Sequence, residues 1–222
     1  MTTPSSNVAP GKVSTAMIVG ALCVAAGGGT FLVQAFGGNA ARAWQAYLVN
    51  FLLFSAMAHG ALLFSTLMHA VRARWSGPLA DLAEAFTSFF PVSLLLYMGL
   101  FLGKEHLFPW IGHDLHGKEA WLNVPFLFAR DVAGLLILYG LGLAYLYHAM
   151  WFKLSDRGAN GPLGRWLWQR WQRRPPDVAR YQRRRTVFSF LYMLAFALVL
   201  SLLGYDLVMS MDPHWYSTLF GA

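Results

Sequence analysis

The sequence contains few charged residues. Only 12% of its 222 residues are Asp, Glu, Lys or Arg, which is about half of the ~25% found in ordinary soluble domains. Hydrophobic residues make up 57% of the chain. This composition excludes an ordinary soluble domain and predicts a protein that lies in a lipid bilayer.

Cysteine is almost absent. Cys23 is the only one, and it lies within an apolar run. A single cysteine cannot build a disulfide framework, a Cys-ligated zinc site or an iron–sulfur site, and it excludes a c-type haem attachment motif, which needs two. We therefore expect no covalent haem and no iron–sulfur cluster in this chain. Any electron transfer would take place in partner subunits.

Long apolar runs dominate what is present. About 20 helical residues cross the ~30 Å hydrocarbon layer of a bilayer, at 1.5 Å rise per residue. The sequence predicts an all-α fold, a polytopic membrane helix bundle, with residues 1–15 as a mobile tail. The five transmembrane helices are expected at about 16–36, 44–71, 79–103, 125–152 and 186–211.

Basic residues are concentrated in one segment. Ten of the seventeen Lys and Arg lie in residues 153–185. Because cytoplasmic loops of membrane proteins are rich in Lys and Arg, this clustering indicates a cytoplasmic loop facing anionic lipid, and not a nucleic-acid surface. The N-terminus and the loop containing Arg72 then also lie in the cytoplasm. Tryptophans among the arginines predict a short amphipathic helix on the membrane surface within this loop.

Three charged residues are expected to meet near the outer face. Asp206 lies about one turn inside the end of the last run, where an unpaired carboxylate costs several kcal/mol and must find a partner, a proton or water. Arg130 and Asp131 enter the fourth run from the same side on the predicted topology. His214 lies at similar depth. These four residues are candidates for a quinone site or a proton path.

Small residues predict where helices pack closely. A stripe along one face of the fourth run should hold a neighbouring helix around a buried acid. Gly27, Gly28 and Gly29 are expected to permit the same close approach on the first run. The stripe consists of Asp131, Gly134, Leu138, Gly142 and Tyr145.

His59 and Glu84 are further candidates at greater depth. Ser55, His59 and Thr66 are spaced by four and seven residues, so they share a helical face that should point into the bundle. His59 could be a proton carrier, a partner of a quinone ring or a haem ligand, or simply an imidazole satisfied by a neighbouring polar group. Glu84 is expected near a helix N-terminus, where the macrodipole favours an acid. Pro91 predicts a kink in the same helix.

The loop between the third and fourth runs contains His113, Asp114 and His116. Their spacing matches no established zinc-ligand pattern, so we expect a solvated polar loop and no metal site.

Several segments resemble the second large integral-membrane subunit of bacterial alternative complex III, a quinol:electron-acceptor oxidoreductase whose membrane subunits are related to those of polysulfide reductase. The resemblance extends over all five predicted helices, and its last segment is the most specific. The segments are WQAYLVNF at 44–51, AEAF at 83–86, FPV at 90–92, WLNVPF at 121–126 with Arg130, and LLGYD at 202–206 with MSMDPHWYST at 209–218.

The resemblance implies a subunit that is not an enzyme by itself. Quinol, or menaquinol, would be oxidised near the outer face of a bacterial inner membrane, and electrons would pass to iron–sulfur and c-type cytochrome subunits. Chains of that family are longer, so this one is expected to be an N-terminal part or one half of a split subunit. The alternative is a non-catalytic scaffold that holds peripheral redox subunits, with its buried charges pairing one another.

Overall fold

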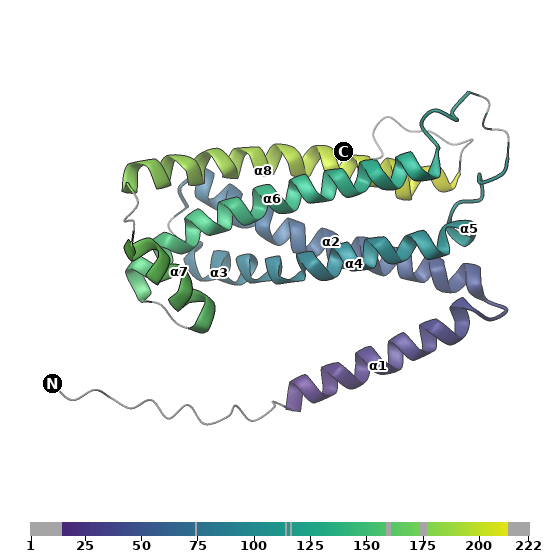
Figure 1. The fold of residues 1–222 in the computed structure, drawn as a ribbon, viewed down its shortest axis with the longest axis horizontal. Coiled ribbons are helices and arrows are strands. Elements are labelled where there is room, and N and C mark those ends of the chain that lie inside the picture. The colour runs from purple at the N-terminus through teal and green to yellow at the C-terminus, as the bar shows by residue number, and fades with distance from the viewer. Residues whose placement is uncertain are drawn as a thin grey trace.

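A computed structural model describes residues 15–73, 75–113, 115, 117–158, 161–173 and 177–212. Their regular structure is entirely helical, with no strand among them (Figure 1). The tail predicted at the N-terminus lies outside these residues, except for Thr15.

Five helical spans are long and apolar enough to cross a membrane. Four are single helices, and the third combines three α-helices with short 3₁₀ segments. This confirms the predicted polytopic bundle, and the chain is a multi-pass membrane protein. The spans are α1 (Thr15–Ala35), α2 (Ala40–Ala70), α3 to α5 (Gly77–Leu107), α6 (Val124–Arg157) and α8 (Val178–Leu207), the last followed by η3 (Met209–Met211).

The third span is interrupted next to Pro91. It consists of α3 (Gly77–Ala85), η1 (Phe86–Phe89), α4 (Phe90–Leu100), η2 (Phe101–Gly103) and α5 (Lys104–Leu107). Proline has no N–H to donate and clashes with the preceding turn, so a continuous α-helical ladder cannot pass through it. The chain tightens into η1 before Pro91, which then occupies the first turn of α4. The predicted irregularity is therefore present.

The basic segment is more helical than the sequence predicted. Residues 153–185 were expected to be a loop with one short helix, but α6 continues to Arg157 and α8 begins at Val178. Asp177 caps α8, because its side chain accepts hydrogen bonds from the backbone N–H groups of Ala179 and Arg180. Between them lies α7 (Gly161–Arg173), which is the predicted amphipathic helix.

The core of the bundle forms where α8 packs on both α6 and α2. A Cβ added to Gly134 would lie 3.2 Å from Val199 of α8, and one added to Gly142 would lie 2.7 Å from Leu62 of α2. Asp131 and Tyr145 are buried on the same face. The small-residue stripe therefore packs against neighbouring helices as predicted.

Helix α1 stands apart from this core. It packs against α2 near the turn that joins them, with Phe31 5.1 Å from both Trp44 and Tyr47 between ring centroids. Figure 1 shows α1 diverging from the bundle beyond that turn, and Ala35 is its only buried residue. A Cβ on Gly27, Gly28 or Gly29 would meet nothing within 4 Å. The expected close approach at these glycines is therefore not made by any described part of the chain.

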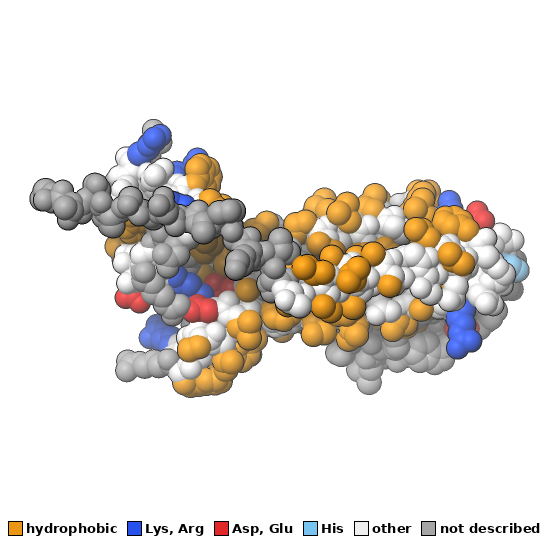
Figure 2. All heavy atoms as spheres, turned by 90° about the horizontal axis from the view of Figure 1, so that it is seen from below, with side chains coloured by type: hydrophobic (Ala, Val, Ile, Leu, Met, Phe, Trp, Pro, Cys, Tyr) orange, Lys and Arg blue, Asp and Glu red, His pale blue; other side chains and the backbone are white. Residues whose placement is uncertain are grey.

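The bundle has two distinct ends. At one end lie the end of α2, the start of α3, the end of α6, α7 and the start of α8, and we call it the basic end. At the opposite end lie the α1–α2 turn, α5 and η3 (Figure 1). Figure 2 shows charged side chains at both ends, with hydrophobic side chains covering the surface between them. This distribution is that of a membrane-spanning bundle.

Candidate functional site

Asp206 is held by a guanidinium and an indole at the end opposite the basic end. Arg130 Nε donates to Asp206 Oδ2 at 2.8 Å, and Arg130 Nη2 lies 2.6 Å from Oδ1. The Trp121 indole N–H donates to Oδ1 at 3.1 Å, while the Arg130 guanidinium lies over the Trp121 ring, 3.8 Å from its centroid. Asp206 is fully buried. The predicted meeting of Arg130 with Asp206 is confirmed.

Asp131 lies beside this ion pair. Its carboxyl group interacts with that of Asp206, and the Tyr97 hydroxyl donates to its Oδ2 at 3.0 Å. Asp131 Oδ1 is buried and has no hydrogen-bond partner. We call Arg130, Asp131 and Asp206 the carboxylate cluster. It brings two buried carboxyl groups together with one guanidinium, so one positive charge is available for two potential negative charges.

His59 lies in the middle of the bundle and is completely buried. Its ring packs against those of Phe90 and Tyr139, with centroid distances of 4.6 and 5.2 Å, and these two rings are 4.9 Å from each other. The Tyr192 hydroxyl donates to the His59 backbone carbonyl at 3.1 Å, so it accepts from His59 Nδ1–H at 3.2 Å. Nε2 then carries the lone pair of the neutral ring, and it has no partner.

Three hydroxyl groups, one each on α6, α4 and α2, form a hydrogen-bonded set that begins at Tyr139, whose ring contacts that of His59. The Tyr139 hydroxyl donates to Ser93 Oγ at 2.9 Å, and Ser93 Oγ lies 2.7 Å from Ser55 Oγ. Ser93 and Tyr97 are one turn apart on α4, about 6 Å along the helix axis. These hydroxyls therefore occupy the interval between the histidine and the carboxylate cluster.

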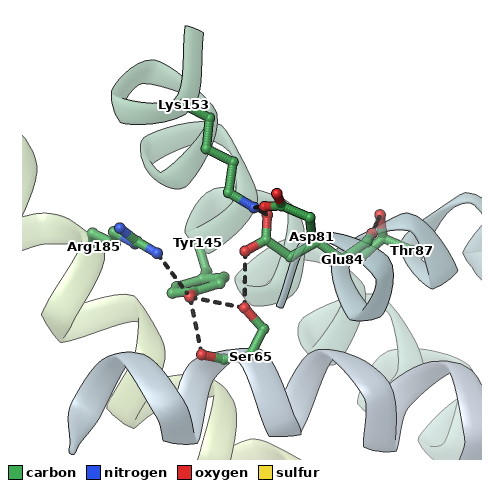
Figure 3. Close-up of polar contacts among 7 residues, drawn as sticks. All are labelled: Ser65, Asp81, Glu84, Thr87, Tyr145, Lys153 and Arg185. Atoms are coloured by element: carbon green, nitrogen blue, oxygen red, sulfur yellow. Dashed lines mark hydrogen bonds and ion pairs between the residues drawn. The ribbon is translucent and has the colours of Figure 1, made fainter. Parts of the chain in front are cut away.

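Glu84 belongs to a second charged cluster, at the basic end (Figure 3). Lys153 Nζ donates to Glu84 Oε2 at 2.8 Å and also pairs with Asp81. Ser65 Oγ donates to Glu84 Oε1 at 2.8 Å and lies 3.2 Å from the Tyr145 hydroxyl. Glu84 is the eighth residue of the nine in α3 and is buried. Glu84 therefore lies near the C-terminal end of α3, and the expected position near a helix N-terminus is wrong. Lys153 and Ser65 are the groups that bind its carboxylate.

The buried polar groups form a row along the bundle. On α2, Ser65 and Ser55 are ten residues apart, about 15 Å along the axis, with His59 between them. The row runs from Glu84 through His59 to Asp131 and crosses most of the ~30 Å hydrocarbon layer. Ser65 and His59 lie six residues or about 9 Å apart, and among the described side chains no continuous chain of hydrogen bonds joins them.

The remaining sequence candidates lie elsewhere. His214 lies outside the described residues, as do Asp114 and His116. Among the residues that the structure describes, no group of three or more His, Cys, Asp or Glu side chains is arranged to hold a metal ion.

Sequence reasoning missed the partners of the candidate residues. Lys153 was assigned to a loop, and Ser65, Tyr97 and Tyr192 were not singled out. For Ser65 the only signal was its partner Tyr145, which lies on the predicted stripe of α6. Ser65 itself lies six residues from His59, about 120° around the helix from it, so its spacing did not place it on the His59 face. Lys153, 69 residues from Glu84 in the chain, could not be assigned to it from sequence spacing.

Comparison with known proteins adds no family assignment. No protein-family model matches the chain, and no curated protein matches it significantly. The resemblance to a quinol-oxidising complex therefore stays an expectation based on the sequence segments given above.

Proposed function

We propose that this chain is a membrane subunit of a quinol-oxidising respiratory complex and that it contributes a proton path through its helix bundle. The observation that carries the proposal is the row of buried polar groups from Glu84 through His59 to Asp131 and Asp206. Ionisable groups inside a membrane are costly, and in membrane proteins they commonly mark proton relays.

The chemistry of the row suits a proton path. The carboxylate cluster has one guanidinium for two carboxyl groups: it is neutral when one carboxyl group is protonated and carries one net negative charge when both are ionised, so it can take up and release one proton. The free Nε2 of His59 can accept a proton in the middle of the bundle. Quinol oxidation releases two protons for every two electrons, and a path away from the site would be needed.

The quinol part of the proposal rests on the sequence resemblance. On that basis the electrons pass to iron–sulfur and c-type cytochrome subunits, and the bundle lies in a bacterial inner membrane. We further propose that the basic end faces the cytoplasm, because the positive-inside rule places Lys- and Arg-rich segments there. The carboxylate cluster then lies near the outer face, where a quinone headgroup could reach Asp206 or Asp131.

The test is the Asp206→Asn variant in the complex purified from its native membrane. Amide and carboxyl have nearly the same shape, but the amide cannot carry the proton. Quinol:acceptor turnover per assembled complex should fall by roughly a hundredfold, the lower end of what a positioned proton-transfer group contributes. Asp156→Asn, an exposed residue at the basic end, is the matched control and should retain full turnover. Unchanged turnover and proton stoichiometry in Asp206→Asn would rule out the path.

A second candidate function is a scaffold for peripheral redox subunits. Two observations favour it: Arg130 and Asp206 form a complete ion pair, and α1 leaves its apolar surface uncovered. This function predicts that Arg130→Ala lowers the yield of assembled complex, while Asp206→Asn leaves the activity of each assembled complex intact. Activity normalised to assembled complex therefore separates the two functions.

A further inference from the structure

A polar cavity opens at the basic end of the bundle. Its volume is about 710 Å³, within the ~300–1,000 Å³ range of small-molecule sites. It lies between the end of α2, the start of α3, Lys153 of α6 and the start of α8. Glu84 and Ser65 line this cavity and belong to the proposed proton path, whereas the arginines that line the cavity have no role in that path.

The carboxylates of the cavity are already neutralised in part. Lys153 bonds both Asp81 and Glu84, so these three side chains together contribute one negative charge when both acids are ionised. Arg72 and Arg185 also line the cavity. Among the described residues, no carboxylate lies within ion-pair distance of either arginine. The lining therefore has an excess of positive charge on the walls formed by α8 and the α2–α3 turn.

Arg185 is held in place by neutral groups. Its Nη2 donates to the Tyr145 hydroxyl at 3.3 Å, and its guanidinium lies 5.5 Å from the Tyr145 ring centroid and 5.9 Å from that of Phe152. Figure 3 shows Arg185 joined to the Tyr145 hydroxyl. The Nε–H of Arg185 is buried and has no acceptor among the described residues. A guanidinium oriented by aromatic contacts, with donors left over, is suited to bind the oxygens of a phosphate group.

The neighbouring side chains add neutral donors and an apolar edge. His69 and Gln182 line the same cavity, together with Met68 and the largely exposed Phe190. Polar groups close to the end of a membrane span and apolar groups at its edge match the two parts of a phospholipid.

We propose that this cavity is a binding site for a phosphate group, with Arg185 and Arg72 as its principal ligands. A phosphodiester of an anionic phospholipid and free inorganic phosphate share the same recognition chemistry. The position of the cavity in the bundle favours the lipid headgroup, since basic pockets between membrane helices are suited to bind such groups.

The test uses the full chain purified in a mild detergent. Native mass spectrometry would count lipids retained after incubation with phosphatidylglycerol or, separately, phosphatidylethanolamine. Thermal unfolding would be measured in phosphate and in chloride at equal ionic strength. Arg185→Gln should weaken phosphatidylglycerol retention roughly tenfold, the loss expected for one hydrogen bond to a charged group. Arg183→Gln is the matched control: it removes the same charge two residues away, from an exposed side chain outside the cavity.

Each outcome decides the proposal. Retention of phosphatidylglycerol that depends on Arg185 but not on Arg183 supports a headgroup site. Stabilisation by inorganic phosphate with the same dependence, and no lipid retained, supports a phosphate site filled from solution. No binding of either, or equal losses in Arg185→Gln and Arg183→Gln, would overturn it. If Arg185→Gln does not fold, Arg72→Gln on the opposite wall has the same expected effect and serves in its place.

Discussion

The ion pair between Arg130 and Asp206 should be one of the strongest local determinants of stability. Arg130→Leu removes the guanidinium and leaves Asp206, which has no exposed surface, with the Trp121 indole as a hydrogen-bond donor. Removing one partner of a buried ion pair costs about 3–5 kcal/mol, because the other charge stays buried without compensation. The lost contact between guanidinium and Trp121 ring adds about 0.5–2 kcal/mol.

The assay is a double-mutant cycle followed by thermal or denaturant unfolding in detergent. For a chain of this size, about 3–5 kcal/mol corresponds to a fall in Tm of roughly 6–20 °C. Arg130→Leu with Asp206→Leu should recover most of that loss, since replacing both partners by apolar groups is often neutral. Arg165→Leu, on the exposed part of α7, should change Tm little. A single variant as stable as the wild type, or a double variant no more stable than Arg130→Leu, would refute the reasoning.

Two further predictions concern packing and the second carboxyl group. Gly142→Ala should destabilise the bundle by about 1–3 kcal/mol, because its Cβ would lie 2.7 Å from Leu62, and overpacking costs that much. Gly140→Ala, where a Cβ meets nothing within 4 Å, should be neutral or stabilise the helix by about 0.5–1 kcal/mol; equal effects at the two sites would contradict the packing described. Tyr97→Phe should lower the free energy of unfolding by about 1–3 kcal/mol, because it leaves buried Asp131 without its hydroxyl donor. If the free energy of unfolding falls no more than it does in Gly140→Ala, the hydrogen bond between Tyr97 and Asp131 contributes little.

The sequence was sufficient to predict the number and approximate positions of the spans, and one of the two charged clusters. Hydropathy locates membrane helices because the bilayer requires about 20 apolar residues in a row. The meeting of Arg130 and Asp206 was predictable because Arg130 lies near the start of α6 and Asp206 near the end of α8, which the topology places at the same end of the bundle, where an unpaired charge is too costly.

The rest depended on the arrangement of the helices. Glu84 and Lys153 lie 69 residues apart, and nothing in either segment indicates that the two helix ends meet. The early start of α8 was missed because its first turns are rich in arginine, which hydropathy reads as loop although arginine is a good helix former. The separation of α1 was missed because its glycines are equally compatible with a partner inside or outside the chain.

The loose attachment of α1 determines what an unfolding experiment on this protein will report. The second to fifth spans share the packed core, whereas α1 contributes almost no buried surface to it. Regions with few buried contacts open at lower free energy than the cooperative core. The second to fifth spans should therefore unfold in a single transition to which α1 does not contribute. Helix α1 can tilt or separate from the bundle without disturbing the row of polar groups. Its amide protons in detergent should exchange independently of those in α6 and α8.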